Sequence, residues 1–397
     1  MENEKNKIGI ITAAIVGMNA MIGAGMATFP SVLSGQVGPA GTLSCLFSIA
    51  LILCIGLSLG RTAEIFPGEG WNYLYPSKWG GHITGIFSAS CYLIAVTVAM
   101  GFLTQQAGVW SHVIFPFIAP KYLGILIILI LMSLVLAGAH TSSWAQYVIA
   151  GFVLIPLILT GTYCWFHFNP KLLVPFMPHG ITSVFQTSSI IMFAFGGFES
   201  IISLYAIVKN PTKNVPRAFI LAISGVGLFY LFFFYGVLFA IPKHYFAEGL
   251  QEPLSSVLAK FFPSAKILSN FVWIGAMFGI IGTLHSMIWS LSTLFTSVLK
   301  KAKGKTIQTA LNKNIWNDKV SVIVTTAAIG LTSLLLHEQA LLPLTVFFIV
   351  ISYTFSIATL FFVKKERFSW HNIITLIGMC GGGLMFYFSA KIIAKLF

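Results

Sequence analysis

Residues 17–26 read Gly-Met-Asn-Ala-Met-Ile-Gly-Ala-Gly-Met, and residues 193–200 read Phe-Ala-Phe-Gly-Gly-Phe-Glu-Ser. Both stretches place closely spaced glycines inside long apolar runs. A glycine within a helix costs about 1 kcal/mol relative to alanine and allows backbone geometries that other residues resist. We therefore expect a helix interruption in each stretch, which frees backbone N–H and C=O groups to bind a polar solute. Close helix packing at the glycines is the alternative explanation.

The sequence around these stretches has the composition of a membrane protein. Of its 397 residues, 57% are hydrophobic and 8% are charged, whereas about 25% are charged in a typical soluble domain. Residues 8–60 contain no Asp, Glu, Lys or Arg. So few charges leave a surface of this area suited to lipid rather than water. The apolar runs are too long for barrel strands, so the sequence predicts an all-α protein with many membrane-spanning helices.

A helix needs about 20 apolar residues to cross the hydrocarbon core of a bilayer. Division of the sequence at prolines, glycines and charged clusters predicts eleven spans. They cover residues 8–33, 39–60, 83–109, 122–139, 144–167, 185–207, 217–241, 267–299, 320–337, 340–363 and 371–396.

The basic residues predict the orientation of these spans. With a cytoplasmic N-terminus, sixteen of the twenty-three Lys and Arg residues fall in segments on the inner side. This bias follows the positive-inside rule and places the C-terminus outside, in a bacterial-type inner or plasma membrane. We read the net charge of +13 as this orientation signal and not as a nucleic-acid-binding surface.

Several sequence features argue against an enzyme or a metalloprotein. The sequence has no Walker-type phosphate loop, nucleophile elbow or His-Glu-x-x-His motif. Its five cysteines all lie in apolar runs without metal-ligand spacing, so no metal or cofactor is predicted.

Glu199 is the only one of ten acidic residues that falls within a predicted span. A charge in the bilayer costs at least about 2.5–3.5 kcal/mol, so such a group is usually paired, hydrated through a cavity, or protonated. A carboxyl that gains and loses a proton as a cavity opens and closes would couple transport to a proton gradient. A structural hydrogen bond to a neighbouring helix is the alternative role.

These stretches resemble the amino acid–polyamine–organocation (APC) permeases. Residues 22–26 (Ile-Gly-Ala-Gly-Met) are similar to the glycine-rich motif in the first helix of that family, although Ala27 stands where the family usually has Phe. Residues 193–199 and the following loop 209–218 are similar to its sixth-helix motif and the loop after it. The Pro-Gly-rich loop 63–70 is similar to the loop after its second helix. The likeness runs from about residue 8 to residue 300.

The resemblance implies a single transmembrane domain, residues 1–397, with the leucine-transporter-like fold. Two inverted five-helix repeats, residues 8–167 and 185–363, would precede an additional helix at 371–396, and helices 1 and 6 would be discontinuous. The family usually has twelve helices, whereas eleven are predicted here.

The resemblance also implies where an amino acid would bind. Backbone amides near Gly23, Ala24 and Gly25 would hold the α-carboxylate, and carbonyls near Met21, Phe193 and Gly196 would hold the α-amino group. Half-helix N-termini attract carboxylates in the same way. The predicted substrate-binding residues are Met21, Ile22, Gly23, Ala24, Gly25, Tyr92, Phe193, Phe195, Gly196, Trp289 and Phe355.

The function expected from the sequence is secondary active transport of amino acids by alternating access, with proton symport as the preferred energetics. Amino acid exchange and sodium symport are the alternatives; Thr283, Ser286 and Ser290 would supply hydroxyls for sodium, and His285 is a candidate proton relay. A membrane sensor that binds a solute without moving it is the rival from another class. The expected partners are an amino acid, the coupling ion and membrane lipid, with no nucleic acid.

Overall fold

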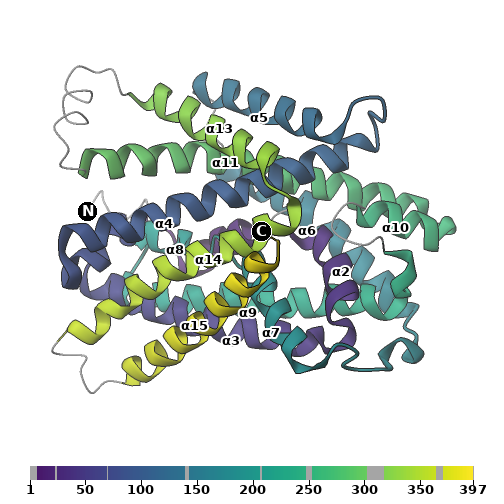
Figure 1. Cartoon of the computed structure of the whole chain (residues 1–397), viewed down its shortest axis with the longest axis horizontal. Coiled ribbons are helices and arrows are strands. Elements are labelled where there is room, and N and C mark those ends of the chain that lie inside the picture. Colours follow the sequence, from purple (N-terminus) through teal and green to yellow (C-terminus); the bar gives the residue numbers. More distant parts are fainter. Residues whose placement is uncertain are drawn as a thin grey trace.

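The computed structural model describes residues 7–22, 25–68, 70–138, 143–205, 208–246, 253–301, 317–363 and 370–396. Long helices dominate these ranges and lie side by side along the longest axis of the molecule (Figure 1). Seven of the described helices are long and apolar enough to cross a membrane. The shorter apolar helices begin at Ile10, Pro120, Gly151 and Gly180.

The helices follow the apolar runs of the sequence. Those that coincide with predicted spans are α3 (Gly41–Ile65), α4 (Trp71–His112), α5 (Pro120–Leu136), α6 (Ser143–Phe166), α9 (Pro211–Ala240), α11 (Lys266–Lys301), α13 (Asp318–Leu335), α14 (Glu338–Ile357) and α15 (Trp370–Leu396). The amphipathic helix α10 (Leu254–Phe261) packs against α11. The all-α prediction is therefore confirmed for the residues that the structure describes, and the count of eleven spans remains a prediction.

Two predicted spans each contain two helices. The first contains α1 (Ile10–Met21) and α2 (Gly25–Gln36), and the sixth contains α7 (Gly180–Ala194) and the short α8 (Ser200–Ser203). Gly23 and Ala24 lie outside the described residues. The residues between α7 and α8 are the second glycine-rich stretch of the sequence.

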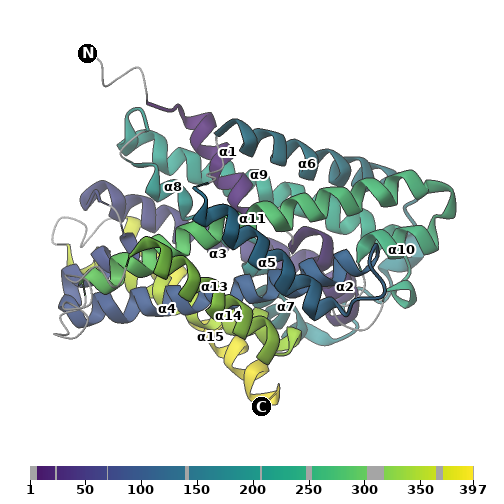
Figure 2. The same cartoon turned by 90° about the horizontal axis from the view of Figure 1, so that it is seen from above.

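Helix α4 begins twelve residues before the predicted third span because an amphipathic segment precedes that span. Gly81 separates the two parts with a backbone φ of 74°, a left-handed value that favours glycine. Beyond this kink, α4 runs through the middle of the molecule and packs against α5, α11, α13 and α14 (Figures 1 and 2). This central position lets one face of α4 line an internal cavity.

Hydroxyl groups join helices inside the bundle. Ser44 on α3 donates to the carbonyl of Val184 on α7 over 2.8 Å, and Ser48 bonds the carbonyl of Ser188 over 3.1 Å. Such bonds help helices to associate in a bilayer, where the hydrophobic effect does not drive one helix against another. They fix α7, and hence the end of α7 at Ala194, relative to α3.

The chain before α1 is paired with the chain before α9. Ile8 and Val208 form a parallel bridge, and the amide of Lys209 donates to the carbonyl of Ile8 over 2.9 Å. Figure 2 shows α1, α8 and α9 together at this end of the molecule. We call this pairing the N-terminal seam.

Candidate functional site

The last residues of α1 and α7 meet at one tyrosine. Tyr230 on α9 is fully buried, and its hydroxyl lies 3.0 Å from the carbonyl oxygen of Met21 and 2.7 Å from that of Ala194. The final carbonyls of a helix have no partner within the helix. The single hydroxyl proton of Tyr230 is shared between one such carbonyl from each helix, which stabilises both ends in the interior of the protein.

The turn after α7 brings the chain against α1. Gly197 adopts a φ of 104°, which a residue with a side chain rarely takes. A Cβ at this position would lie 2.6 Å from the carbonyl oxygen of Ala20. Only glycine therefore fits here without a shift of the α1 backbone. The backbone conformation and this contact together explain why position 197 of the sixth-span motif is glycine.

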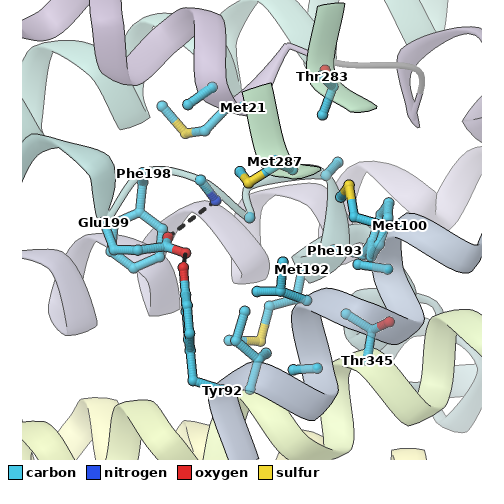
Figure 3. Close-up of a pocket in the computed structure, with 18 of the residues that line it drawn as sticks. Met21, Tyr92, Met100, Met192, Phe193, Phe198, Glu199, Thr283, Met287 and Thr345 are labelled. Carbon is cyan, nitrogen blue, oxygen red and sulfur yellow. Dashed lines mark hydrogen bonds between the residues drawn. The ribbon is translucent and has the colours of Figure 1, made fainter. Parts of the chain in front are cut away.

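The same turn positions Glu199, whose side chain is 4% exposed. The hydroxyl of Tyr92 on α4 donates to Oε1 over 2.7 Å, and the hydroxyl of Tyr353 on α14 donates to Oε2 over 2.9 Å. The Gly197 amide also donates to Oε2 over 3.0 Å. Figure 3 shows the Tyr92 and Gly197 contacts. The carboxylate thus links the turn to two neighbouring helices.

Aromatic rings enclose this carboxylate. The Trp71 ring stacks on that of Tyr353 at 5.8 Å between centroids and meets that of Tyr92 edge-on at 5.2 Å. The ring of Phe198 lies 5.3 Å from that of Tyr353. We call Glu199, Tyr92 and Tyr353 the carboxylate latch, because hydrogen bonds through this carboxylate join three segments of the chain.

A cavity lies between the latch and the ends of α1 and α7. It contains about 750 Å³ of empty space, including the part that opens to solvent. Methionine side chains from four helices enter it (Figure 3). Its lining consists of Ala20, Met21, Ile52, Tyr92, Ala95, Val96, Ala99, Met100, Leu103, Met192, Phe193, Ala194, Gly196, Gly197, Phe198, Glu199, Thr283, Met287, Thr345, Ile349 and Tyr353.

Comparison with known proteins identifies the family. The model of the amino acid permease family matches residues 8–395, nearly the whole chain. The chain belongs to the amino acid permease family. It is therefore an integral, multi-pass membrane protein of the APC superfamily, as the glycine-rich stretches and the loop after the sixth span indicate.

Individual relatives of this family member share about a quarter of its residues. An aspartate-proton symporter of Bacillus subtilis is 25% identical over 262 residues, which are 62% of this chain and 50% of the symporter. A branched-chain amino acid permease of the same organism is 24% identical over 310 residues (72% and 65%). The mouse cationic amino acid transporter 4 is 22% identical over 402 residues (91% and 60%). The matched region spans less than two thirds of each relative's length.

The structure brings five residues named from the sequence of this family member to the cavity: Met21, Tyr92, Phe193, Gly196 and Glu199. The Phe193 ring lies 5.5 Å from that of Phe102 and 6.4 Å from that of Phe29. Gly25 is the first residue of α2, and the Gly23 and Ala24 amides expected to hold a carboxylate lie outside the described residues.

Four other residues named from the sequence do not line the cavity of this family member. Ile22 and Phe195 are buried beside it, and the Phe195 ring packs on that of Tyr230 at 5.2 Å. Trp289 is 50% exposed on the outer side of α11. The Phe355 ring packs between those of Trp79 and Phe87, away from the cavity lining.

Trp289 and Phe355 each lie two positions along the sequence from a residue that lines the cavity. Met287 takes the place expected of Trp289, and Tyr353 takes the place expected of Phe355. Two positions rotate a side chain by about 200° around a helix, which is nearly the opposite face. Residues four apart share a face, and the Thr283–Met287 and Ile349–Tyr353 pairs do line the cavity. The four-residue spacing within each pair is visible in the sequence and indicates which residues share a helix face.

The sodium alternative has partial geometric support in this family member. Thr283 lines the cavity, whereas Ser290 is exposed and His285 is outside the lining. Among the described residues, no group of three or more His, Cys, Asp or Glu side chains is placed to hold a metal ion.

Proposed function

We propose that this chain is a secondary active transporter that moves amino acids by alternating access and couples their movement to protons. The observation that carries the proposal is the carboxylate latch, a buried acid beside an internal cavity in a chain of the amino acid permease family. Intramembrane ionisable residues commonly serve in proton relays of transporters. The proton named for the aspartate-proton symporter of Bacillus subtilis agrees with this choice of coupling ion.

In this proposal, α1–α2 and α7–α8 are the discontinuous first and sixth of eleven spans and open two inverted repeats, residues 8–167 and 185–363. The ends of α1 and α7 lie beside the cavity, where carbonyls near Met21, Phe193 and Gly196 would hold an α-amino group; a carbonyl that already accepts one hydrogen bond has a second lone pair for this purpose. The α-carboxylate would bind amides at 23–25, next to the N-terminus of α2. The pairing of two helix breaks by Tyr230 supports this arrangement.

The latch offers a chemical link between proton binding and opening. An ionised carboxylate only accepts hydrogen bonds, and Glu199 accepts three. A protonated carboxyl donates through one oxygen, so the tyrosine hydroxyl bonded to that oxygen would have to rotate and accept the bond or give it up. Protonation would thereby replace a bond to a charged carboxylate with a weaker neutral one and loosen the turn after α7 from α4 or α14. This change gives the two protonation states different preferences for the closed and open arrangements.

The proposed orientation puts the N-terminus in the cytoplasm and the C-terminus outside. The latch would then close the cavity on the cytoplasmic side, and the rings of Phe29, Phe102 and Phe193 would close it on the outer side. Trp71, the first residue of α4, packs against the rings of Tyr92 and Tyr353 in the latch. Opening to the cytoplasm would require the hydrogen bonds of Tyr92 and Tyr353 to Glu199 to break. Opening to the outside would require the three phenylalanine rings to separate.

The test is uptake of labelled amino acids into proteoliposomes under a pH gradient, under a sodium gradient, and with unlabelled amino acid inside. We compare the parent with Glu199→Gln, which keeps the size of the side chain but cannot be ionised. The expected result is at least a tenfold loss of accumulation driven by the pH gradient, with exchange against internal amino acid retained. Tyr353→Phe, which removes one latch donor, should lower pH-driven uptake less.

Three results would contradict the proposal. Undiminished pH-driven accumulation by Glu199→Gln would refute the coupling role of Glu199. Uptake that needs only internal amino acid, or only a sodium gradient, would make the parent an exchanger or a sodium symporter. Amino acid binding without any flux would make it a sensor.

A further inference from the structure

The relatives leave open which side chain the cavity accepts. Their names refer to aspartate, branched-chain and cationic amino acids, so they cover acidic, aliphatic and basic side chains. The lining of the cavity in this chain is therefore the place to look for selectivity. We infer that the cavity selects amino acids with an uncharged aliphatic or thioether side chain. This inference names the substrate class within the proposed function and rests on it.

The first observation is the absence of a usable countercharge in the lining. Among the described residues of the lining, Glu199 is the only ionisable one apart from tyrosine, and none is Lys, Arg or His. An acidic side chain would therefore enter without a cation to pair with. A charge placed in such surroundings without a partner costs several kcal/mol or more. The lining thus excludes aspartate and glutamate side chains.

Glu199 is also unavailable to a basic side chain. Its two oxygens already accept bonds from Tyr92, Tyr353 and the Gly197 amide, and it is 4% exposed. A lysine or arginine substrate would have to reach the remaining acceptor site on Oε1 of this buried carboxylate or displace one of these donors. The displaced hydroxyl of Tyr92 or Tyr353 would then need another acceptor in a region enclosed by aromatic rings. Charge attraction to this carboxylate would therefore be opposed by the loss of the latch.

The second observation is the apolar wall opposite the helix breaks. Helix α4 contributes Ala95, Val96, Ala99, Met100 and Leu103 to the cavity. Ile52 on α3 and Ile349 on α14 add to this wall. A substrate whose backbone groups sit at the ends of α1 and α7 would direct its side chain toward these residues. Besides the latch tyrosines, the hydroxyl-bearing side chains in the part of the lining that the structure describes are Thr283 and Thr345.

Four methionines give this wall an adaptable shape. Met21, Met100, Met192 and Met287 come from α1, α4, α7 and α11, and they point into the cavity in Figure 3. Methionine has three rotatable bonds and a polarisable sulfur, so it fits several apolar shapes. The cavity should therefore accept leucine, isoleucine, valine and methionine side chains, which differ in branching but share an apolar surface.

The experiment measures binding and transport separately. Stabilisation of the purified protein against heat is recorded with each amino acid of a panel, and the same panel competes with labelled leucine for uptake. Each buried methylene raises affinity roughly fourfold, so leucine should bind at least tenfold more tightly than alanine. Lysine, arginine, aspartate and glutamate should fail to stabilise or compete at a hundredfold excess. Effective competition by any charged amino acid would overturn the inference.

A matched pair of variants tests whether the wall of α4 sets the preference. Ala99→Met adds three heavy atoms at a lining position, and Ala327→Met makes the same change at an exposed position on α13. Ala99→Met should lower the ratio of leucine to alanine affinity at least fivefold, and Ala327→Met should leave it unchanged. An unchanged ratio in a folded Ala99→Met protein would overturn the assignment. Leucine binding without uptake would refute transport while leaving the selectivity intact.

Discussion

The hydroxyl of Tyr230 can be tested against a control on the same helix. Tyr230→Phe removes the donor shared by the carbonyls of Met21 and Ala194. Tyr235 is also buried on α9, but its hydroxyl has no hydrogen-bond partner among the described residues. Tyr235→Phe therefore removes the same atom from the same helix without breaking a described contact.

The magnitudes follow from these contacts. Hydrogen bonds between membrane helices contribute about 0.6 kcal/mol on average and up to about 1.7 kcal/mol. Because Tyr230 serves two helix-end carbonyls, its loss should lower the free energy of unfolding by about 1–2 kcal/mol. Removal of the Tyr235 hydroxyl should be neutral or stabilising, because an unpaired buried hydroxyl is itself unfavourable. The two variants should differ by at least about 1 kcal/mol, roughly a fivefold difference in the unfolding equilibrium constant.

Equilibrium unfolding in mixed micelles, followed by the circular dichroism of the helices, measures this difference. Uptake at saturating substrate adds a functional readout, since freed carbonyls at Met21 and Ala194 should also disturb substrate binding. Equal stability of the two variants, or a larger loss in Tyr235→Phe, would refute the reasoning that Tyr230 holds the two helix ends together.

Two further predictions concern the glycine turn and the register of α11. Gly197→Ala should lower the free energy of unfolding by about 2 kcal/mol or more in the same assay, because the new Cβ would lie 2.6 Å from the carbonyl oxygen of Ala20. Gly383→Ala is the control, because a Cβ at that position has no atom within 4 Å. Met287→Ala should raise the KM for leucine about threefold to tenfold, since Met287 lines the cavity. Trp289→Ala, at a half-exposed position outside the lining, should leave that KM within twofold; the reverse ranking would restore Trp289 to the substrate path.

The sequence was sufficient for the membrane helices because lipid imposes a simple requirement. Charge-free runs of about 20 residues have few stable forms other than a spanning helix. The glycine-rich stretches 17–26 and 193–200 predicted interruptions of the first and sixth spans; α1 ends at Met21 and α7 at Ala194, and the interruption of each span remains a prediction. Glu199 stood out because a single acid in an apolar run demands partners.

The partners themselves depend on tertiary structure. Tyr230 and Tyr353 are two of twelve tyrosines, and their spacing in the sequence does not reveal which carbonyl or carboxylate each would reach. Phe355 was named by its position in the family pattern, and Trp289 lay near an aromatic position of that pattern but about two residues out of register; neither residue is in the cavity lining. Aromatic residues are frequent throughout this sequence, so residue type alone could not correct the register.

The N-terminal seam has a consequence for how this sequence can vary. Its hydrogen bond joins the amide of Lys209 to the carbonyl of Ile8, so it is made by the backbone alone. Nearly any side chain at either position leaves that bond intact. Proline at 209 is the exception, because it has no N–H to donate. Two chain segments two hundred residues apart are thus held together by a contact that tolerates wide divergence and forbids a single amino acid.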